Sequence, residues 1–230
     1  MNTPQGLRMC PLFAGLPEDN LKELSTIAIG KKFARGELIF SDGDAGEGFY
    51  VVIHGRVKLF KLGMDGREQI LHFVANGDPF GEVTLFSGVS YPAFARAATD
   101  LEVLFFKRND FEALVRQDPQ LSLNMIAIMS HHLRRFATLV EELSLKDVPA
   151  RVAKYLLDSA TRNGREHDAG IEFDLDISKT ELAQRLGTIS ETISRTLGKM
   201  KSTGIIDTNG KKVTILDMDT LEEVASGLRK

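Results

Sequence analysis

The chain has 230 residues, of which 43% are hydrophobic, and its formal net charge at pH 7 is −3. These values predict a globular protein of one large or two ordinary domains and argue against a generic nucleic-acid coat, although a local basic face remains compatible with them. The single cysteine, Cys10, excludes a disulfide framework and any iron–sulfur cluster that needs several thiolates from one chain. No apolar run approaches the roughly 20 residues of a membrane span and no signal peptide is visible, so we expect a soluble, cytoplasmic protein without membrane contact.

The N-terminal half predicts a short helix followed by β structure. Residues 17–28 (PEDNLKELSTIA) have the pattern of an amphipathic helix. From Lys31 to Arg108, short β-rich runs are separated by turn sequences such as DGDAGEG, MDGRE and NGD, and no helical period competes. This spacing predicts a β-barrel or jelly-roll domain.

A long helix is predicted to follow the β domain. Residues 109–116 form a short helix, and Pro119 opens a longer one, in which apolar residues recur in steps of three and four, the a/d period of a coiled coil. This dimer seam consists of Ile126, Met129, Leu133, Phe136, Val140 and Leu143. The strict period favours a parallel dimer, with a helix packed only on its own barrel as the alternative. Leu121, Leu123 and Ile128 lie off the seam and are expected to pack on the barrel.

A change of pattern marks the start of the C-terminal domain. Residues 144–149 (SLKDVP) interrupt the helix and predict a hinge, residues 152–160 predict a helix, and residues 162–178 a loop with one short strand. The predicted divisions are a β domain at 1–118, a dimerisation helix and hinge at 119–146, and a C-terminal domain at 147–230.

Residues 177–200 predict two short helices around Gly187. Ser178 with Glu181, and Thr188 with Glu191, have the spacing of capping boxes. The expected buried residues are Leu182, Ala183 and Leu186 in the first helix and Ile193, Leu197 and Met200 in the second. The opposite face of the second helix carries Ser190, Glu191, Ser194, Arg195 and Lys199. This layout is typical of a helix-turn-helix, whose second helix enters the major groove of DNA.

Two β runs, GIIDT and KKVTIL, follow the second helix and are joined by Asn-Gly, which predicts a hairpin, or wing. The segment from Arg195 to Lys212 contains five basic residues but only one acidic residue, Asp207. The basic residues are Arg195, Lys199, Lys201, Lys211 and Lys212. A phosphate-facing surface is therefore compatible with an acidic chain. Residues 219–228 predict a last short helix, and the fold class is α+β.

The order of these parts resembles the CRP/FNR family of transcription regulators, which join a β-roll of cyclic-nucleotide-binding type, a long dimer helix and a winged helix-turn-helix. The resemblance rests on GELIF (36–40), YVVIHGRVKL (50–59), GDPFGEVTLF (77–86), ARVAKYLL (150–157) and ETISR (191–195). It implies a homodimer on a palindromic double-stranded DNA operator, with RNA polymerase as a partner. No nucleophile–base set, zinc spacing or phosphate loop predicts an enzyme.

Glu191, Ser194 and Arg195 are similar to the E-x-x-S-R pattern of FNR-type members, which read TTGAT-like half-sites. Arg195 can donate two hydrogen bonds to guanine O6 and N7, and Glu191 can accept one from cytosine N4, unless it serves only as a helix cap. Ser190 stands where cyclic-AMP receptors carry an arginine. The resemblance also implies contacts to phosphates, which set register, from Lys179, Thr180, Thr188, Ser190, Thr192, Lys199 and Lys211.

The sensor half departs from the cyclic-AMP pattern. Where those members carry an Arg-Ser pair that grips the cyclic phosphate, this chain has Tyr91-Pro92, and their Thr-Ser pair on the long helix is Phe136-Ala137 here. Proline has no N–H to donate, and tyrosine has no charged group that could bind a phosphate through two hydrogen bonds as arginine does. Binding of cyclic AMP is therefore not expected. The predicted pocket is apolar and suits an uncharged ligand or haem. Its predicted lining is Phe80, Gly81, Glu82, Tyr91, Pro92, Phe94, Leu133 and Phe136.

Residues 141–157 (EELSLKDVPARVAKYLL) are similar to the same stretch of DNR-type and HcpR-type regulators, which respond to nitric oxide and are thought to use haem. Haem is thus a candidate cofactor. The candidate iron ligands are His54, His72, His131, His132, Met1 and Cys10, with His131 and His132 beside the seam as the first to test, and a structural or solvated role is the alternative for each. A cyclic-nucleotide-responsive regulator, and a regulatory module acting on a protein partner, remain alternative functions.

Overall fold

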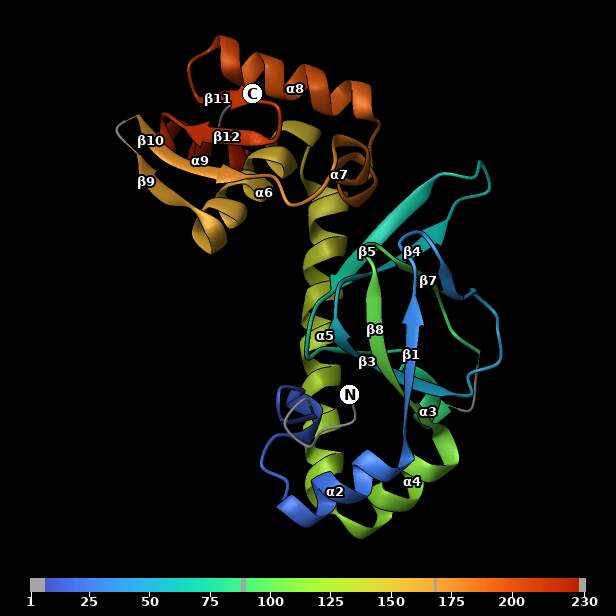
Figure 1. The fold of residues 1–230 in the computed structure, drawn as a ribbon. Helices are drawn as coiled ribbons and strands as arrows, with labels where there is room; N and C mark the ends of the chain where they lie inside the picture. Colours follow the sequence, from blue (N-terminus) through green and yellow to red (C-terminus); the bar gives the residue numbers. More distant parts are fainter. Residues whose placement is uncertain (1–6, 88–89, 168, 228–230) are drawn as a thin grey trace. The chain divides into compact units, whose positions relative to one another are not determined.

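The computed structural model describes residues 7–87, 90–167 and 169–227, and the chain divides into two compact units, residues 1–136 and residues 137–230. The N-terminal unit is a β-roll with helices, and the C-terminal unit is helical with a small sheet (Figure 1). The α+β class predicted from the sequence is confirmed. Among the described residues, no helix combines the length and apolar character that a bilayer crossing requires.

The β-roll is built from two antiparallel four-stranded sheets within the described ranges. The first has the order β1-β8-β3-β6, comprising Ala28–Phe33, Leu101–Lys107, Gly48–His54 and Pro79–Phe80. The second has the order β2-β7-β4-β5, comprising Leu38–Phe40, Phe94–Ala97, Val57–Leu62 and Glu68–Val74. Helices α2 (Glu18–Ile27) and α4 (Arg108–Gln117) flank the roll in the sequence, close to their predicted positions.

One helix interrupts the segment that was expected to be entirely β. Helix α3 (Val83–Ser87) follows Gly81, whose φ of +79° turns the chain. The hydroxyl of Thr84 lies 2.9 Å from the backbone carbonyl oxygen of Gly81 and 3.2 Å from that of Gly48, so its one hydrogen is shared between the turn and strand β3. The expectation was wrong here because a five-residue helix is too short for its period to be visible in a sequence.

The first sheet separates two hydrophobic cores. Successive residues of a strand point to opposite faces, so Tyr50 faces the interior of the roll while Phe49 faces a second core on the helical side. The interior core is rich in aromatic rings, namely Phe40, Tyr50, Phe80, Tyr91 and Phe105, and the helical core includes Phe49, Phe106, Phe111, Leu121 and Met125. Burial on both faces explains the continuous apolar runs of β3 and β8.

A charged cluster lies on the outer face of the second sheet. Glu68 accepts from Lys58 at 2.6 Å and from Arg96 at 2.7 Å, and both cations lie over the ring of Phe60. Burial raises the pKa of the Glu68 carboxyl, but the hydrogen bonds and charges of Lys58 and Arg96 outweigh it, so the net shift is downward. Glu68 is therefore held ionised and ties β4, β5 and β7 together.

Helix α5 (Pro119–Leu145) is continuous over 27 residues. Leu121 is buried and Ile128 packs against the helical core, as predicted, whereas Leu123 is 59% exposed and that expectation was wrong. The amide of Asn124 donates to the carbonyls of Leu12 and Ala14, which fixes the start of α5 to the N-terminal segment around the short 3₁₀ helix η1 (Pro11–Phe13).

The dimer seam of α5 remains largely uncovered in the single chain. Leu133 is 71% exposed, Val140 64% and Ile126 61%, and Phe136 is also exposed, while Met129 and Leu143 are half-buried. A helix side of this apolar character is typical of a surface that a partner covers.

Within the C-terminal unit, the predicted hinge lies between two helices. Helix α5 ends at Leu145 and α6 (Val148–Asn163) begins after Asp147, whose carboxylate caps it by accepting from the backbone N–H of Ala150. The remaining sheet has the order β11-β12-β10-β9, comprising Ile206–Asn209, Lys212–Ile215, Gly170–Asp174 and Arg165–His167. The last helix, α9, spans Met218–Ser226; its predicted end at residue 228 lies outside the described residues.

Strand β9 was not expected, because only one strand was predicted between residues 162 and 178. It pairs with β10 as an antiparallel hairpin at the edge of the sheet. Arg165 and Glu166 are both exposed, so this edge strand lacks the alternation of apolar and polar residues by which strands are recognised.

Candidate nucleic-acid interface and sensor cavity

Helices α7 (Lys179–Arg185) and α8 (Ser190–Ser202) form the predicted helix-turn-helix, with Gly187 at φ +61° between them. The first capping box is confirmed: the hydroxyl of Ser178 accepts from the N–H of Glu181, and the carboxylate of Glu181 accepts from the N–H of Ser178. The second capping box is wrong. Helix α8 begins one residue later than predicted, so its N-cap is Ile189, whose side chain has no hydrogen-bond acceptor. The N–H of Thr188 donates back to Ala183 and closes α7.

The missing second cap bears on Glu191. A purely structural capping role was the alternative to base reading, and the described structure contains no such cap. Glu191 is exposed, as are Ser194, Arg195 and Lys199. These four side chains therefore stand on the open face of α8.

The opposite faces of the two helices are buried against each other and the unit's core. The buried residues are Leu182, Ala183, Leu186, Ile193, Leu197 and Met200, all at most 5% exposed. Behind them, the hydroxyl of Tyr155 on α6 donates to Asp176 at 2.6 Å, and the guanidinium of Arg185 lies over the Tyr155 ring. The recognition helix is thus held on a rigid base, as a reading element must be.

Five of the seven residues implied to contact phosphate lie around the start of the two helices. Lys179 and Thr180 are exposed in the first turn of α7, and Thr188, Ser190 and Thr192 are half-buried near the start of α8. The hydroxyls of Ser190 and Thr180 lie 3.4 Å apart, which brings the two helix starts together.

The wing is present as the hairpin of β11 and β12, with a shifted turn. Asn209 pairs with Lys212, so the two loop residues are Gly210 and Lys211 rather than Asn209 and Gly210. Gly210 has φ +63°, and a glycine in first position is typical of type II′ hairpin turns. Lys211 consequently lies at the exposed tip.

Two of the five basic residues counted in this region are paired with acids. Lys201 contacts Asp207 at 2.7 Å, and Lys212 contacts Glu172 at 2.8 Å, which raises the pKa of Lys212. Over the described ranges, Arg195, Lys199 and Lys211 make no ion pair. The basic surface is therefore smaller than the sequence count indicated, and it is centred on α8 and the wing tip. The Lys212–Glu172 pair was missed because it depends on the pairing of β10 with β12.

In the N-terminal unit, two residues of the predicted pocket belong to the packed interior. The ring of Tyr91 stacks on Phe40 with centroids 3.8 Å apart, and its hydroxyl donates to the carbonyl of Gly48 at 2.7 Å. Phe80 stacks on Tyr50 with centroids 5.0 Å apart. A Cβ on Gly81 would lie 3.0 Å from the Tyr91 ring, so aromatic side chains fill the roll interior beside the turn that precedes α3.

The other predicted pocket residues lie elsewhere. Phe94 stacks on Phe60 at 5.3 Å, on the outer face of the second sheet, because its neighbour Ala95 faces the interior. Pro92 is exposed, and Leu133 and Phe136 lie on the exposed seam. The structure therefore does not bring the eight predicted residues around one cavity.

A cavity of about 360 Å³ lies between the roll and α5. Its lining comes from segments far apart in the sequence: Pro11, His72, Val74, Asp78, Pro79, Asn124, Ala127, Ile128, His131, His132 and Arg135. The Nδ1 atom of His132 lies 2.9 Å from a carboxylate oxygen of Glu82, which is 6% exposed, and the rings of His72 and His132 are 5.6 Å apart. We call this the sensor cavity. The sequence singled out both α5 histidines and Glu82 but not their meeting, which requires the tertiary fold.

The remaining candidate iron ligands are less well placed. Burial raises the pKa of the Cys10 thiol to about 12, so it stays protonated and is a poor metal ligand. His54 is exposed at the end of β3, and Met1 lies outside the described residues. In the part of the chain that the structure describes, no three His, Cys, Asp or Glu side chains are already grouped for a metal ion.

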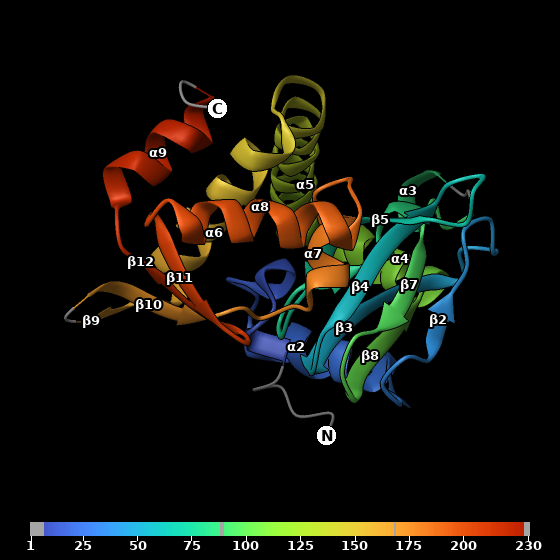
Figure 2. The ribbon, with the colours of Figure 1, turned by 90° about the horizontal axis from the view of Figure 1, so that it is seen from above.

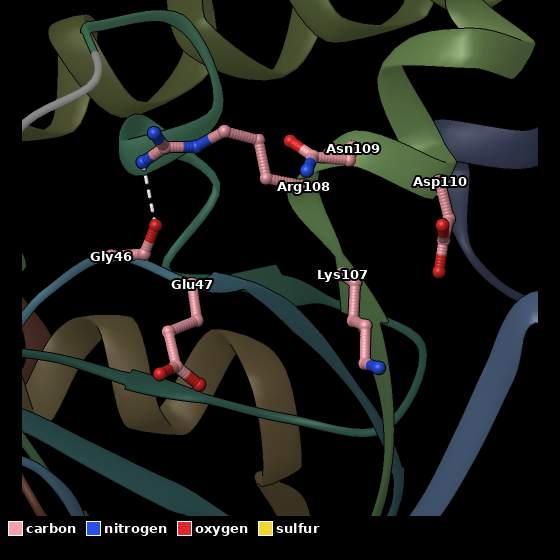
Figure 3. A pocket seen from close by; sticks show the side chains of 6 residues that line it. All are labelled: Gly46, Glu47, Lys107, Arg108, Asn109 and Asp110. Atoms are coloured by element: carbon pink, nitrogen blue, oxygen red, sulfur yellow. Dashed lines mark hydrogen bonds between the residues drawn. The ribbon is translucent and has the colours of Figure 1, made fainter.

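A second, more open cleft of about 530 Å³ lies where β8 meets α4 (Figure 3). It is lined by Gly46, Glu47 and residues 107–110, and the Arg108 guanidinium donates to the carbonyl of Gly46 at 2.5 Å. Its two cations and two carboxylates balance each other, so it favours neither an anion nor a cation.

A β-roll, a long helix with an apolar seam and a winged helix-turn-helix with an exposed basic face define the class of this chain as a DNA-binding protein. The model of the cyclic nucleotide-binding domain matches residues 30–118, and that of the Crp-like helix-turn-helix domain matches residues 150–224. The chain belongs to the CRP/FNR family of transcription regulators, which are not enzymes.

Individual relatives cover nearly the whole chain. The cyclic AMP receptor protein of Thermus thermophilus is 33% identical over 95% of this chain and 98% of its own length. The nitrogen fixation regulation protein FixK of Azorhizobium caulinodans is 33% identical over 91% of this chain and 83% of its own. Among solved structures, a CooA mutant from Carboxydothermus hydrogenoformans aligns with a TM-score of 0.77 at 25% identity, covering 93% of both chains.

Proposed function

We propose that this protein is a cytoplasmic, homodimeric regulator that binds a palindromic operator with TTG-containing half-sites and acts with RNA polymerase. The observation that carries the proposal is the open face of α8, where Glu191, Ser194 and Arg195 stand exposed over a buried helix base. Arg195 would read guanine and Glu191 cytosine, while Lys199 and Lys211 would add phosphate contacts.

The dimer geometry follows from the exposed seam of α5. Two copies joined along the seam would present two recognition helices to successive major grooves, about 34 Å apart on one face of the duplex. An effector in the N-terminal unit would shift the helices about the seam, and the break at Asp147 would transmit the shift. The effector acts only through its different affinities for the two arrangements.

Cyclic AMP does not suit this sensor. Tyr91 and Pro92 supply no cation at the position of the pair that binds the cyclic phosphate; Pro92 has no N–H, and the backbone N–H of Tyr91 donates to Asp44. Aromatic rings fill the roll interior beside Gly81. We therefore propose that the effector binds in the sensor cavity. A cyclic-nucleotide-responsive regulator, or a module acting on a protein partner, would be the alternatives if DNA binding or its ligand control failed.

Haem that senses nitric oxide, as in DNR-type and HcpR-type regulators, is the specific effector that we propose to test. A metal-binding histidine usually donates the N–H of its second ring nitrogen to a carboxylate, a backbone carbonyl or water. The Nδ1 atom of His132 lies 2.9 Å from a carboxylate oxygen of the buried Glu82, which is such an arrangement. His132, and His72 or His131 beside it, would hold the iron, which when bound would supply a site for the gas. The cavity volume of about 360 Å³ is small for a porphyrin, so binding would require α5 to move.

The test is a titration of a fluorescent duplex carrying two inverted TTGAT half-sites, one helical turn apart, with and without added haem and nitric oxide. We expect specific binding that changes when nitric oxide is added to haem-loaded protein, together with a stoichiometric Soret band that the His132→Ala variant lacks. Specific DNA binding without any haem uptake would contradict the proposal that haem is the effector, while the proposal of a DNA-binding regulator would stand. No preference for the palindrome would contradict the proposed function itself.

A further inference from the structure

Helix α8 contains a glycine that the protein's own packing does not require. Gly198 lies in the interior of the 13-residue helix, where glycine is among the least favourable residues. Its φ is outside the left-handed region, and a Cβ built there would meet no atom of the described residues within 4 Å, apart from its chain neighbours and the nearby backbone of its own helix. Neither backbone strain nor close packing inside this chain accounts for the missing side chain.

Gly198 lies on the side of α8 that carries the proposed base-reading residues. It follows Arg195 by three positions, Ser194 by four and Glu191 by seven, the spacings that place residues on one helix face. Like those residues it is exposed, and it is followed by the exposed Lys199. Figure 2 looks onto the length of α8 in the C-terminal unit.

The DNA element that this position meets follows from the way recognition helices dock. Their N-terminal residues reach the base edges, so a residue two turns further on faces the wall of the groove, which is sugar and phosphate. A glycine is suited to a place where another backbone approaches a helix closely. Lys199 next to it is suited to the phosphate charge.

We propose that Gly198 is a positioning residue of the DNA interface: its missing side chain lets the sugar–phosphate wall of the major groove lie against the backbone of α8. This proposal rests on the proposed function. With the close approach, Arg195 and Glu191 reach the base edges; a methyl group at position 198 would hold the helix away from them.

The substitution Gly198→Ala tests this proposal because its effects on folding and on binding have opposite signs. Alanine is the better helix former and meets no protein atom, so the melting temperature of the free protein should rise by about 2–4 °C. Affinity for the TTGAT palindrome should nevertheless fall about tenfold or more, the scale of one lost base contact. No charge is removed, so the dependence of affinity on salt should be unchanged.

Lys199→Ala is the companion variant, because it should weaken binding through charge and lower the salt dependence by about one phosphate contact per half-site. An alanine variant at 198 that binds the palindrome as tightly as the parent protein would overturn the proposal. So would weaker binding accompanied by a lower melting temperature, since the effect would then be one of folding. If the parent protein itself shows no preference for the palindrome, the proposed function fails instead, so the two failures are distinguishable.

Discussion

Replacing Arg195 by alanine is expected to abolish discrimination at the guanine of the half-site without weakening the fold. The side chain is exposed and makes no ion pair with the described residues, so its removal costs no contact within the chain. A bidentate arginine–guanine contact is worth about 1–3 kcal/mol, which corresponds to a loss of affinity of about 5- to 150-fold per half-site. A fluorescence titration with the TTGAT palindrome measures this loss.

The discriminating control is a duplex in which adenine replaces the half-site guanine. The parent protein should bind it more weakly than the TTGAT palindrome, while Arg195→Ala should bind both duplexes equally. Arg165→Ala is the matched variant, because it removes the same charge from an exposed position on the edge strand β9. It should keep the preference for guanine. If Arg195→Ala retained that preference, another residue would read the base.

The substitution Leu133→Glu is expected to convert the dimer into monomers and to lower operator affinity by about 100-fold or more. Leu133 is 71% exposed in the single chain and lies at the middle of the seam, where a carboxylate would be buried opposite its own copy. A monomer engages only one half-site and loses the gain from binding both at once. Sedimentation velocity should show the mass falling from twice 25.4 kDa to that of one chain.

Leu123→Glu is the matched control for this prediction. Leu123 lies on the same helix and is 59% exposed, but it falls off the seam. The variant should remain dimeric and bind the operator normally. If both Leu133→Glu and Leu123→Glu remained dimeric, the seam would not be what holds the two copies together. If both became monomeric, the dimer surface would extend around the helix beyond the seam.

The features that the sequence predicted correctly are mostly local. Ser178 and Glu181 are three residues apart, Gly187 stops α7, and the buried positions of α8 recur at helical spacing. Each of these depends on chain geometry over a few residues, which a sequence displays directly. Even so, the cap at Thr188 did not form, because α8 begins one residue later with Ile189 as its N-cap, while the N–H of Thr188 donates to Ala183 in the turn that ends α7.

The features that could not be predicted depend on strand register and on distant segments. Phe94 lies opposite Phe60 in the regular pairing of β7 with β4, on the face of the sheet away from the interior core to which Ala95 belongs. A pairing displaced by one residue would have turned Phe94 toward the interior. In the same way, His72 and His132 are 60 positions apart and meet only when α5 packs on the roll. The sensor cavity therefore became visible only in the structure.

The measurement that tests this account most directly is the number of chains bound to one duplex. Sedimentation equilibrium of the protein with the TTGAT palindrome should give two chains per duplex, and a scrambled duplex of equal length should bind far more weakly at the same salt. Both the exposed face of α8 and the seam of α5 are needed for this result. One chain per duplex, or equal affinity for the scrambled duplex, would contradict the proposed mode of DNA binding.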